Sequence, residues 1–245
     1  MLAIAFIIAS NTSFAQGKYL VGVKGGLDIP NLAPNDDGYS PVSKGWSSRL
    51  GPYFGVVGVY TISKKFGLQV ELNYSSQGGK KNGQQAMPVA YFTNNPPPGV
   101  QNYVYTNFNI NIRVNYIELP IMARFSQPLG RNWQLIATAG PYVGYVVAAK
   151  VAVKGTSNIY ADEAETTPLL PQAFTADGDQ DIKNDVRKFN VGAQGNIGVA
   201  LKMPLGNILL TVGGNYGFIP LQKDNSLGKN NIGAANLTVG YLINL

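Results

Sequence analysis

Five charged residues fall on the polar alternate positions of the strands that the sequence predicts. They are Lys24, Glu71, Glu118, Arg124 and Lys202. If these positions face the inside of a β-barrel, the charges can pair and hydrogen-bond there, whereas an Arg or Lys facing lipid at the midplane would cost ~2–4 kcal/mol. We therefore predict a polar network in the lumen. Such a network would either fill the barrel or line a path for protons or small solutes.

Glu71 and Glu118 are the carboxylates that lie well inside predicted strands, so they are the candidates for a paired acid–base site. Glycosidase-like or protease-like catalysis would need a fixed separation between them, which the sequence does not supply. Glu118 and Arg124 lie on one extended strand and are too far apart along it to pair directly. We expect their partners on neighbouring strands, with Glu71 and Lys202 as the candidates.

A second group of carboxylates lies in a predicted loop, residues 152–186. Asp177, Asp179 and Asp181 alternate with other residues and resemble the start of a calcium-binding loop. The pattern then departs from that loop, because Ile182 stands where glycine is required and Lys188 stands where the bidentate glutamate belongs. Two interpretations stay open, a weak cation site and a solvated acidic loop that faces outward.

The composition excludes several classes of chemistry. The chain contains neither histidine nor cysteine, which removes histidine-dependent membrane enzymes, disulfides and thiolate metal sites. We predict no enzymatic activity and no cofactor. The net charge is +6, but Lys and Arg are scattered and form no basic stripe with interleaved aromatics, so we predict no nucleic-acid partner.

The strands that must position these residues are clearest between residues 189 and 218. Apolar or small side chains alternate there with polar or small ones, on both sides of a Pro-Leu-Gly-Asn turn. Period two indicates strands with one apolar and one polar face. Only 13% of the residues are charged, against about 25% in soluble domains. Long strands joined by a tight turn in such a chain favour a membrane-spanning hairpin with its apolar face toward lipid.

The whole chain divides into eight such strands. Their predicted ranges are 19–29, 50–62, 66–77, 109–126, 133–151, 189–202, 210–218 and 236–243. Short turns follow the second, fourth and sixth strands, and long loops follow the first, third, fifth and seventh. We predict an all-β fold, an eight-stranded antiparallel up-and-down transmembrane β-barrel with short periplasmic turns and long external loops. Because lipid tolerates no open sheet edge, the last strand should pair with the first.

Two finer features follow from the same pattern. Val114 and Tyr116 are out of phase with Leu119 and Ile121, which predicts a β-bulge near residues 116–117. Aromatic residues near the predicted strand ends should form girdles at the two membrane interfaces. These aromatic residues are Tyr19, Tyr60, Phe66, Trp133, Tyr216, Phe218 and Tyr241.

Residues 1–15 have the pattern of a secretory signal peptide, because an apolar run is followed by Ser-Phe-Ala. We therefore divide the chain into a signal peptide, 1–15, and a barrel domain, 16–245. This division predicts a bacterial outer-membrane protein that is exported by its signal peptide. Outer-membrane lipid would surround it, and other envelope proteins would contact its external loops or periplasmic turns.

Three segments resemble a known family. Residues 116–121 read Tyr-Ile-Glu-Leu-Pro-Ile, residues 71–74 read Glu-Leu-Asn-Tyr, and residues 140–145 read Gly-Pro-Tyr-Val-Gly-Tyr. On these segments the chain resembles the PorT-like outer-membrane β-barrel domain family of the Bacteroidetes, across the whole mature chain. The resemblance implies a barrel fold and, through the family name, a link to secretion.

The function that we expect is that of an integral outer-membrane protein with a structural or interaction role. An accessory subunit of a secretion or surface complex is the form that the resemblance implies. A narrow channel or small-ligand-binding barrel is the alternative, and a soluble lipocalin-like binder is the third possibility. The direction of the apolar face separates the third from the others, because a soluble barrel would bury residues such as Val191, Ile197, Val199, Val212 and Val239 at its centre.

Overall fold

The computed structural model describes residues 19–35, 41–91, 93, 95, 100, 102–224 and 229–245. The predicted signal peptide, residues 1–15, lies outside the described residues. Among the described residues, no helix has the length and apolar character needed to cross a membrane. The helical elements there are two short 3-10 helices, η1 (Pro41–Ser43) and η2 (Val89–Tyr91).

Eleven strands make up the rest of the regular structure in these ranges. They are β1 (Tyr19–Pro34), β2 (Gly51–Thr61), β3 (Phe66–Lys81), β4 (Gln85–Pro88), β5 (Tyr103–Thr106), β6 (Asn109–Pro128), β7 (Trp133–Ser157), β8 (Phe174–Asp181), β9 (Phe189–Met203), β10 (Gly206–Gly217) and β11 (Asn230–Asn244). Eight of them form one antiparallel ring in the order β1, β2, β3, β6, β7, β9, β10, β11.

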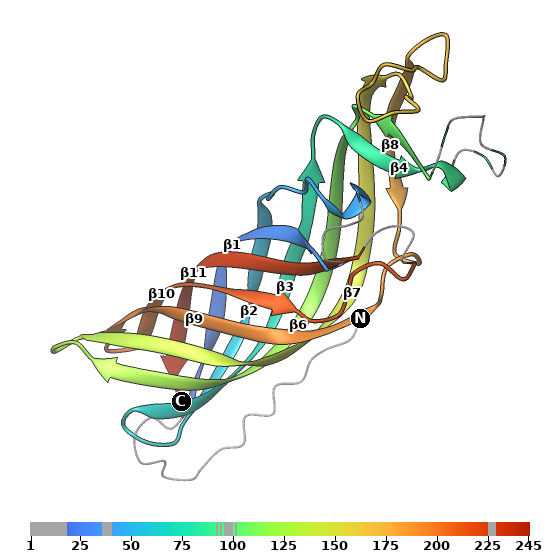
Figure 1. Cartoon of the computed structure of the whole chain (residues 1–245). Coiled ribbons are helices and arrows are strands. Elements are labelled where there is room, and N and C mark those ends of the chain that lie inside the picture. Colours follow the sequence, from blue (N-terminus) through green and yellow to red (C-terminus); the bar gives the residue numbers. More distant parts are fainter. Residues whose placement is uncertain are drawn as a thin grey trace, which may run out of the picture.

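Pairing between the first and last strands closes the ring (Figure 1). β1 pairs with β11 from Leu20↔Asn244 to Pro34↔Asn230, while β6 pairs with β7 to complete the circuit. The predicted eight-stranded up-and-down barrel and its closure by strands one and eight are therefore confirmed.

The connections alternate between short and long, as predicted. Short turns join β2 to β3, β6 to β7 and β9 to β10. In the β6–β7 turn, Gly130 has a φ of 124°, a backbone region in which glycine meets no Cβ penalty. The backbone N–H of Leu245 donates to Tyr19 O, so the start of β1 and the end of β11 lie beside the short turns, on the periplasmic side.

Three strands lie in segments that we predicted as loops. β4 and β5 form a two-stranded sheet, and β8 pairs with the outer part of β7 from Lys150↔Asp181 to Ser157↔Phe174. All three rise above the ring at its external end (Figure 1). β4 and β5 have only four residues each, too few for period two to stand out. β8 is almost entirely exposed and so carries no apolar alternation.

The outer face of the ring is apolar. Val191, Ile197, Val212 and Val239 are 42–56% exposed, and Val199 is intermediate. In a membrane these side chains contact lipid. The soluble lipocalin-like alternative is therefore wrong, because a soluble barrel buries its apolar side chains and presents polar ones to water.

Aromatic pairs mark both edges of this apolar face. Tyr19–Tyr60 and Phe66–Phe125 lie near the short turns. Phe54–Tyr74, Tyr145–Phe189 and Tyr216–Phe218 lie toward the external end. Trp133 is exposed at the first position of β7, also beside a short turn. These two belts of aromatic residues are the predicted interfacial girdles, in which aromatic side chains lie at the level of the lipid head groups.

The predicted bulge exists, but it lies on the neighbouring strand. Asn115 pairs with Ala148 and Tyr116 with Val146, so Val147 is the extra residue and belongs to β7. The β3–β6 register runs without interruption through the same positions. Val114 and Tyr116 are fully buried and point inward in phase with Glu118. No residue is therefore inserted into β6. The apolar residues of β6 change from outward to inward positions because the lumen is polar at Glu118 and apolar at Val114 and Tyr116.

The lumen is layered along the barrel axis. An apolar cluster near the short turns contains Val57, Val59, Ile136, Ala200, Leu209 and Leu242. A second apolar cluster closes the external end and contains Leu32, Val114, Tyr116, Val146, Ala149, Val186, Leu221 and Ile232. Polar side chains fill the space between the two clusters. Strand residues supply most of both clusters, while Val186 and Leu221 come from external connections and fold inward as a cap.

Candidate functional site

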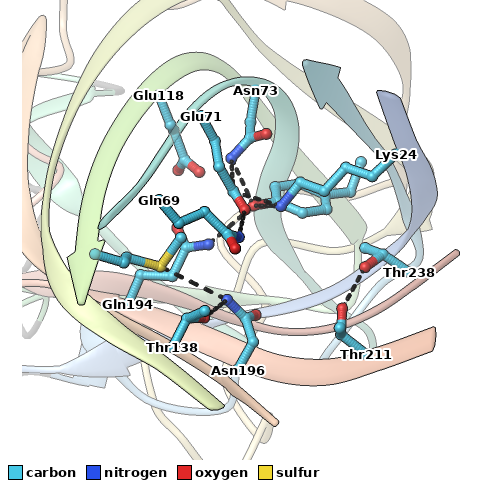
Figure 2. A network of polar contacts seen from close by, with 12 residues as sticks. Lys24, Gln69, Glu71, Asn73, Glu118, Thr138, Gln194, Asn196, Thr211 and Thr238 are labelled. Carbon is cyan, nitrogen blue, oxygen red and sulfur yellow. Dashed lines mark hydrogen bonds and ion pairs between the residues drawn. The ribbon is translucent and has the colours of Figure 1, made fainter. Parts of the chain in front are cut away.

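The centre of the lumen holds a buried ion pair (Figure 2). Lys24 Nζ lies 2.5 Å from Glu71 Oε2, and the two side chains are 9% and 1% exposed. β2 separates β1 from β3, and the position of β2 that pairs with both Lys24 and Asn73 is Gly55. A Cβ at Gly55 would lie 2.4 Å from Asn73 Oδ1. The missing side chain therefore lets Lys24 cross β2 and reach Glu71.

Glu71 is the acceptor at the centre of this network. Asn73 Nδ2 donates to Glu71 Oε2 at 2.9 Å, and Gln69 Nε2 donates to Glu71 Oε1 at 2.6 Å. Gln69 also accepts from Arg124 Nη1 at 2.5 Å. Arg124 is therefore linked to Glu71 through the neutral amide of Gln69, without a direct ion pair.

Tyr53 contributes a second acceptor that connects opposite walls of the barrel. Its hydroxyl oxygen accepts from Asn73 Nδ2 at 2.8 Å, from Lys24 Nζ at 3.2 Å and from Gln194 Nε2 at 3.2 Å. Gln194 lies on β9, across the lumen from β2. The Lys24 ammonium also sits 4.5 Å from the centroid of the Tyr53 ring, within cation–π range.

Glu118 lies in a separate group nearer the external end. It accepts from Gln77 Nε2 at 2.7 Å and from Asn215 Nδ2 at 3.2 Å. Gln77 also donates to Ser75 Oγ at 2.9 Å, and Ser75 donates to Asp28 Oδ2 at 2.6 Å. A short chain of hydrogen bonds therefore joins the buried carboxyl groups of Glu118 and Asp28.

These groups leave almost no free space. The cavity beside Lys24, Glu71 and Arg124 measures about 20 Å³, close to the ~10–15 Å³ that one water molecule requires. Apolar clusters lie above and below the polar layer, and Arg124 reaches past the lower cluster to the periplasmic mouth. The hydrogen bonds of the central site are therefore held in place around a cavity that is too small for a substrate or for a hydrated ion.

The structure brings together four of the five predicted lumen residues. Lys24, Glu71, Glu118 and Arg124 are all inward-facing and buried or nearly so. Lys202 is exposed at the periplasmic mouth, so its place in the predicted network is wrong. The predicted partners also differ, because Glu118 and Arg124 bind amide side chains and not Glu71 or Lys202.

Several members of the network were missed. Asp28 is fully buried, so Glu71 and Glu118 are not the only carboxylates inside strands. Gln69, Asn73 and Gln77 share one face of β3 with Glu71, and their alternate spacing was a usable signal. Tyr53 gave no such signal, because an aromatic residue at an alternate position fits either face of a barrel strand.

A wide vestibule lies below the lower apolar cluster, at the periplasmic mouth. Its volume is about 820 Å³, and its wall includes Lys64, Lys65 and Lys202, with Arg124 at its inner end. Arg124 also borders the small central cavity, so its side chain separates the two spaces. No acidic side chain from the described residues lines the vestibule.

The acidic residues of the predicted cation loop lie on β8. Asp177, Asp179 and Asp181 occupy alternate positions of that extended strand. Lys154 Nζ lies 3.7 Å from Asp177 Oδ1, and Arg113 Nη2 lies 3.6 Å from Asp179 Oδ2. Within the described part of the chain, no three His, Cys, Asp or Glu side chains gather where they could hold a metal ion. The acidic segment is therefore a strand whose charges face a basic edge of β6 and β7.

One exposed carboxylate orders the external connection between β7 and β8. Asp162 Oδ2 accepts from the N–H and the hydroxyl of Thr166, both at 2.9 Å, and Asp162 Oδ1 accepts from Thr167 N–H at 2.7 Å. These hydrogen bonds stabilise the charged form and lower the pKa of Asp162 below its ordinary value.

A closed antiparallel ring with an apolar outer face, two aromatic girdles and a polar interior defines an integral outer-membrane β-barrel. The family model of the outer membrane protein beta-barrel domain matches residues 14–223, and the chain belongs to that family. The protein is therefore an outer-membrane β-barrel protein of the bacterial outer membrane.

A comparison with solved structures finds two outer-surface proteins of other bacteria, both at low identity. Neisserial surface protein A (NspA) is 11% identical, with 93% of this chain and 97% of that chain covered and a TM-score of 0.44. Ail, the attachment invasion locus protein of Yersinia pestis, is 12% identical, with 94% of this chain and 100% of that chain covered and a TM-score of 0.38. No curated protein sequence matches the chain.

Proposed function

We propose that the protein is a non-conducting outer-membrane scaffold whose external segments bind another envelope or surface component. The observation that carries the proposal is the filled interior. Two apolar clusters enclose a polar layer in which the free volume is about 20 Å³. A barrel filled in this way has its outer surfaces and its two ends available for function, and no path through its centre.

The external end offers such a surface. β4, β5 and β8 extend the sheet structure beyond the girdles (Figure 1), and Leu170 and Phe174 are 39% and 53% exposed there. A surface that combines exposed apolar side chains with charged ones offers a protein partner both kinds of contact found in interfaces. An accessory subunit of a secretion or surface complex fits this arrangement.

We also propose the finer assignments that accompany this role. The protein would be exported by residues 1–15 and would be a PorT-like barrel, as the resemblance at residues 116–121 implies. It would have no enzymatic activity, because Glu71 and Glu118 are each engaged in hydrogen bonds within the filled lumen. N-terminal sequencing of the mature protein from membranes tests the export step, and Gln16 is the expected first residue.

Conductance in planar bilayers tests the closed lumen. The purified protein should give no discrete current steps under conditions in which a general porin, inserted as the positive control, does. Discrete, reproducible steps from the wild-type protein would defeat the scaffold proposal and favour the narrow-channel alternative.

Capture in mild detergent from native membranes tests the external surface. In one variant, a short Gly-Ser linker would replace residues 158–173, which connect β7 to β8 and include Leu170. A partner that binds the external end should be captured by wild type and lost with this variant. A variant altered only in the β6–β7 turn, Arg131→Gln, is the matched control and should retain the partner. Equal capture by all three proteins would contradict the proposed binding surface.

A further inference from the structure

Within the described part of the chain, no acidic side chain pairs with the cations of the periplasmic vestibule. The described ion pairs are Lys24–Glu71, Arg113–Asp179 and Lys154–Asp177, so among the described residues no carboxylate side chain lies within 4.0 Å of Lys64, Lys65, Lys202 or Arg124.

The acidic side chains of the described residues lie elsewhere in the barrel. Asp28, Glu71 and Glu118 are in the lumen, and the others belong to external segments. Those others are Asp162, Glu163, Glu165, Asp177, Asp179, Asp181, Asp185 and Asp224. Four positive charges therefore converge on one concavity that no carboxylate side chain of the described residues lines, and a concave mouth of one sign concentrates ions of the other sign.

The burial and the hydrogen bonding of Arg124 are the main evidence for a ligand in the vestibule. It is only 5% exposed, and its hydrogen bond goes to the neutral amide of Gln69. Beyond Gln69 the next acceptor is Glu71, which is already paired with Lys24. A buried guanidinium that shares its nearest carboxylate, Glu71, with another cation is costly, and its remaining donors form a planar fork that suits an oxyanion. Arg124 borders the vestibule, so an anion that enters from the periplasm can reach it.

We propose that the vestibule binds a phosphate-bearing anion, with Arg124 contacting one phosphate group and Lys64, Lys65 and Lys202 neutralising the rest. A phosphate monoester concentrates about −1.5 to −2 charges on one group, which suits this density of cations better than a single carboxylate. The volume of about 820 Å³ lies in the ~300–1,000 Å³ range of ligand pockets. A soluble phosphate ester and a phospholipid head group of the periplasmic leaflet, whose phosphodiester carries one charge, both present the phosphate oxygens that Arg124 would contact.

Calorimetric titration of inorganic tripolyphosphate into the barrel, in non-ionic detergent at low salt, tests the proposal. Wild type should bind. Arg124→Gln and the triple variant Lys64→Gln/Lys65→Gln/Lys202→Gln should each weaken binding roughly tenfold or more, as expected when charge-assisted hydrogen bonds or ion contacts are lost. The matched control is Lys44→Gln/Lys80→Gln/Lys188→Gln, which removes three exposed lysines from the external side and should bind as wild type does.

The triple vestibule variant changes only exposed side chains, so it keeps the test valid if Arg124→Gln does not fold. No binding by wild type, or equal binding by wild type and the triple vestibule variant, would overturn the proposal. Equal weakening in the control variant would also overturn it, because binding would then follow total charge.

Lipid retention identifies the source of the phosphate group. If wild type retains phosphatidylglycerol through delipidation and the triple vestibule variant does not, the site binds a lipid head group. Tripolyphosphate binding without such retention assigns it to a soluble phosphate ester.

Discussion

Lys24 of β1 and Glu71 of β3 form an ion pair across the intervening strand β2. Their 2.5 Å contact passes over Gly55 of β2 and joins β1 to β3 inside the barrel. Two ions so deep in the lumen stabilise the fold only while both remain, because each one alone would be an uncompensated buried charge. This dependence gives the first prediction.

Glu71→Gln should destabilise the barrel by about 3–5 kcal/mol, the usual cost of removing one member of a buried pair. Reversible urea unfolding in lipid vesicles measures the change. Asp177→Asn makes the same chemical change at the exposed pair with Lys154, where about 0–1 kcal/mol is expected. Similar losses in the two variants would show that the lumen pair is solvated. Adding Lys24→Met to Glu71→Gln should recover part of the stability.

Tyr53→Phe removes one oxygen that accepts hydrogen bonds from Lys24, Asn73 and Gln194. Buried donors that lose their acceptor cost about 1–3 kcal/mol, so the same unfolding assay should register a loss of that size. Tyr216→Phe is the matched change on the outer face, where the ring is 44% exposed, and about 0.5 kcal/mol or less is expected. An unchanged midpoint for Tyr53→Phe would contradict the network as described.

Val239→Arg tests the lipid-facing surface. Val239 is 56% exposed on the outer face, midway along β11, and an arginine at the midplane should cost ~2–4 kcal/mol. Ile243→Arg places the same side chain on the same strand near the periplasmic interface, where ~0–1 kcal/mol is expected. Folding yield and stability in vesicles measure both. The membrane assignment predicts this order of the two costs, and the reverse order would argue against it.

The Asp162 turn should be sensitive to acid. Because the folded-state pKa is lowered by the hydrogen bonds from Thr166 and Thr167, the turn is stabilised above the ordinary Asp pKa of about 3.9. That stabilisation is lost as the pH falls through the lower folded-state value. The protection factors of the Thr166 and Thr167 amides, which compare the observed exchange rate with the intrinsic rate at the same pH, should therefore fall on acidification. Asp162→Asn should show weak protection at every pH. Protection of Thr166 and Thr167 in Asp162→Asn equal to that in wild type would contradict this role.

The alternation of apolar and polar residues predicted the eight strands, because lipid on one side and a polar filling on the other make every membrane-spanning strand alternate. The closure of the ring followed from a second rule, that lipid tolerates no open sheet edge. The rule of alternation fails above the external girdle. There Val114 and Tyr116 point inward, while Arg113 and Asn115 lie on the opposite face. Outside the membrane the outer face meets water and the lumen becomes an apolar cap, so the pattern inverts. We predicted a bulge in β6 because we applied the membrane rule, apolar outside and polar inside, to the part of β6 that lies beyond the membrane as well.

The candidate site was predictable only in part. The alternation of positions along each strand correctly placed Lys24, Glu71, Glu118 and Arg124 inside the barrel. This placement does not depend on how neighbouring strands are aligned. Their partners depend on the stagger between strands, which no single strand encodes. Lys202 has the correct parity but lies one residue from the end of β9, where the lumen opens and an inward position no longer means burial.

The seam between β1 and β11 has a consequence for how the molecule forms. It joins residues as far apart in the sequence as Leu20 and Asn244, the most non-local type of contact a chain of this length can make. The loop-closure entropy of that step must be overcome before the contacts along the seam contribute any stability. Assembly should therefore be slow and concerted, and the chain cannot complete its insertion until the final strand is available. A mutation that weakens the seam should accordingly slow the folding rate more than a comparable change within any of the three short-turn hairpins.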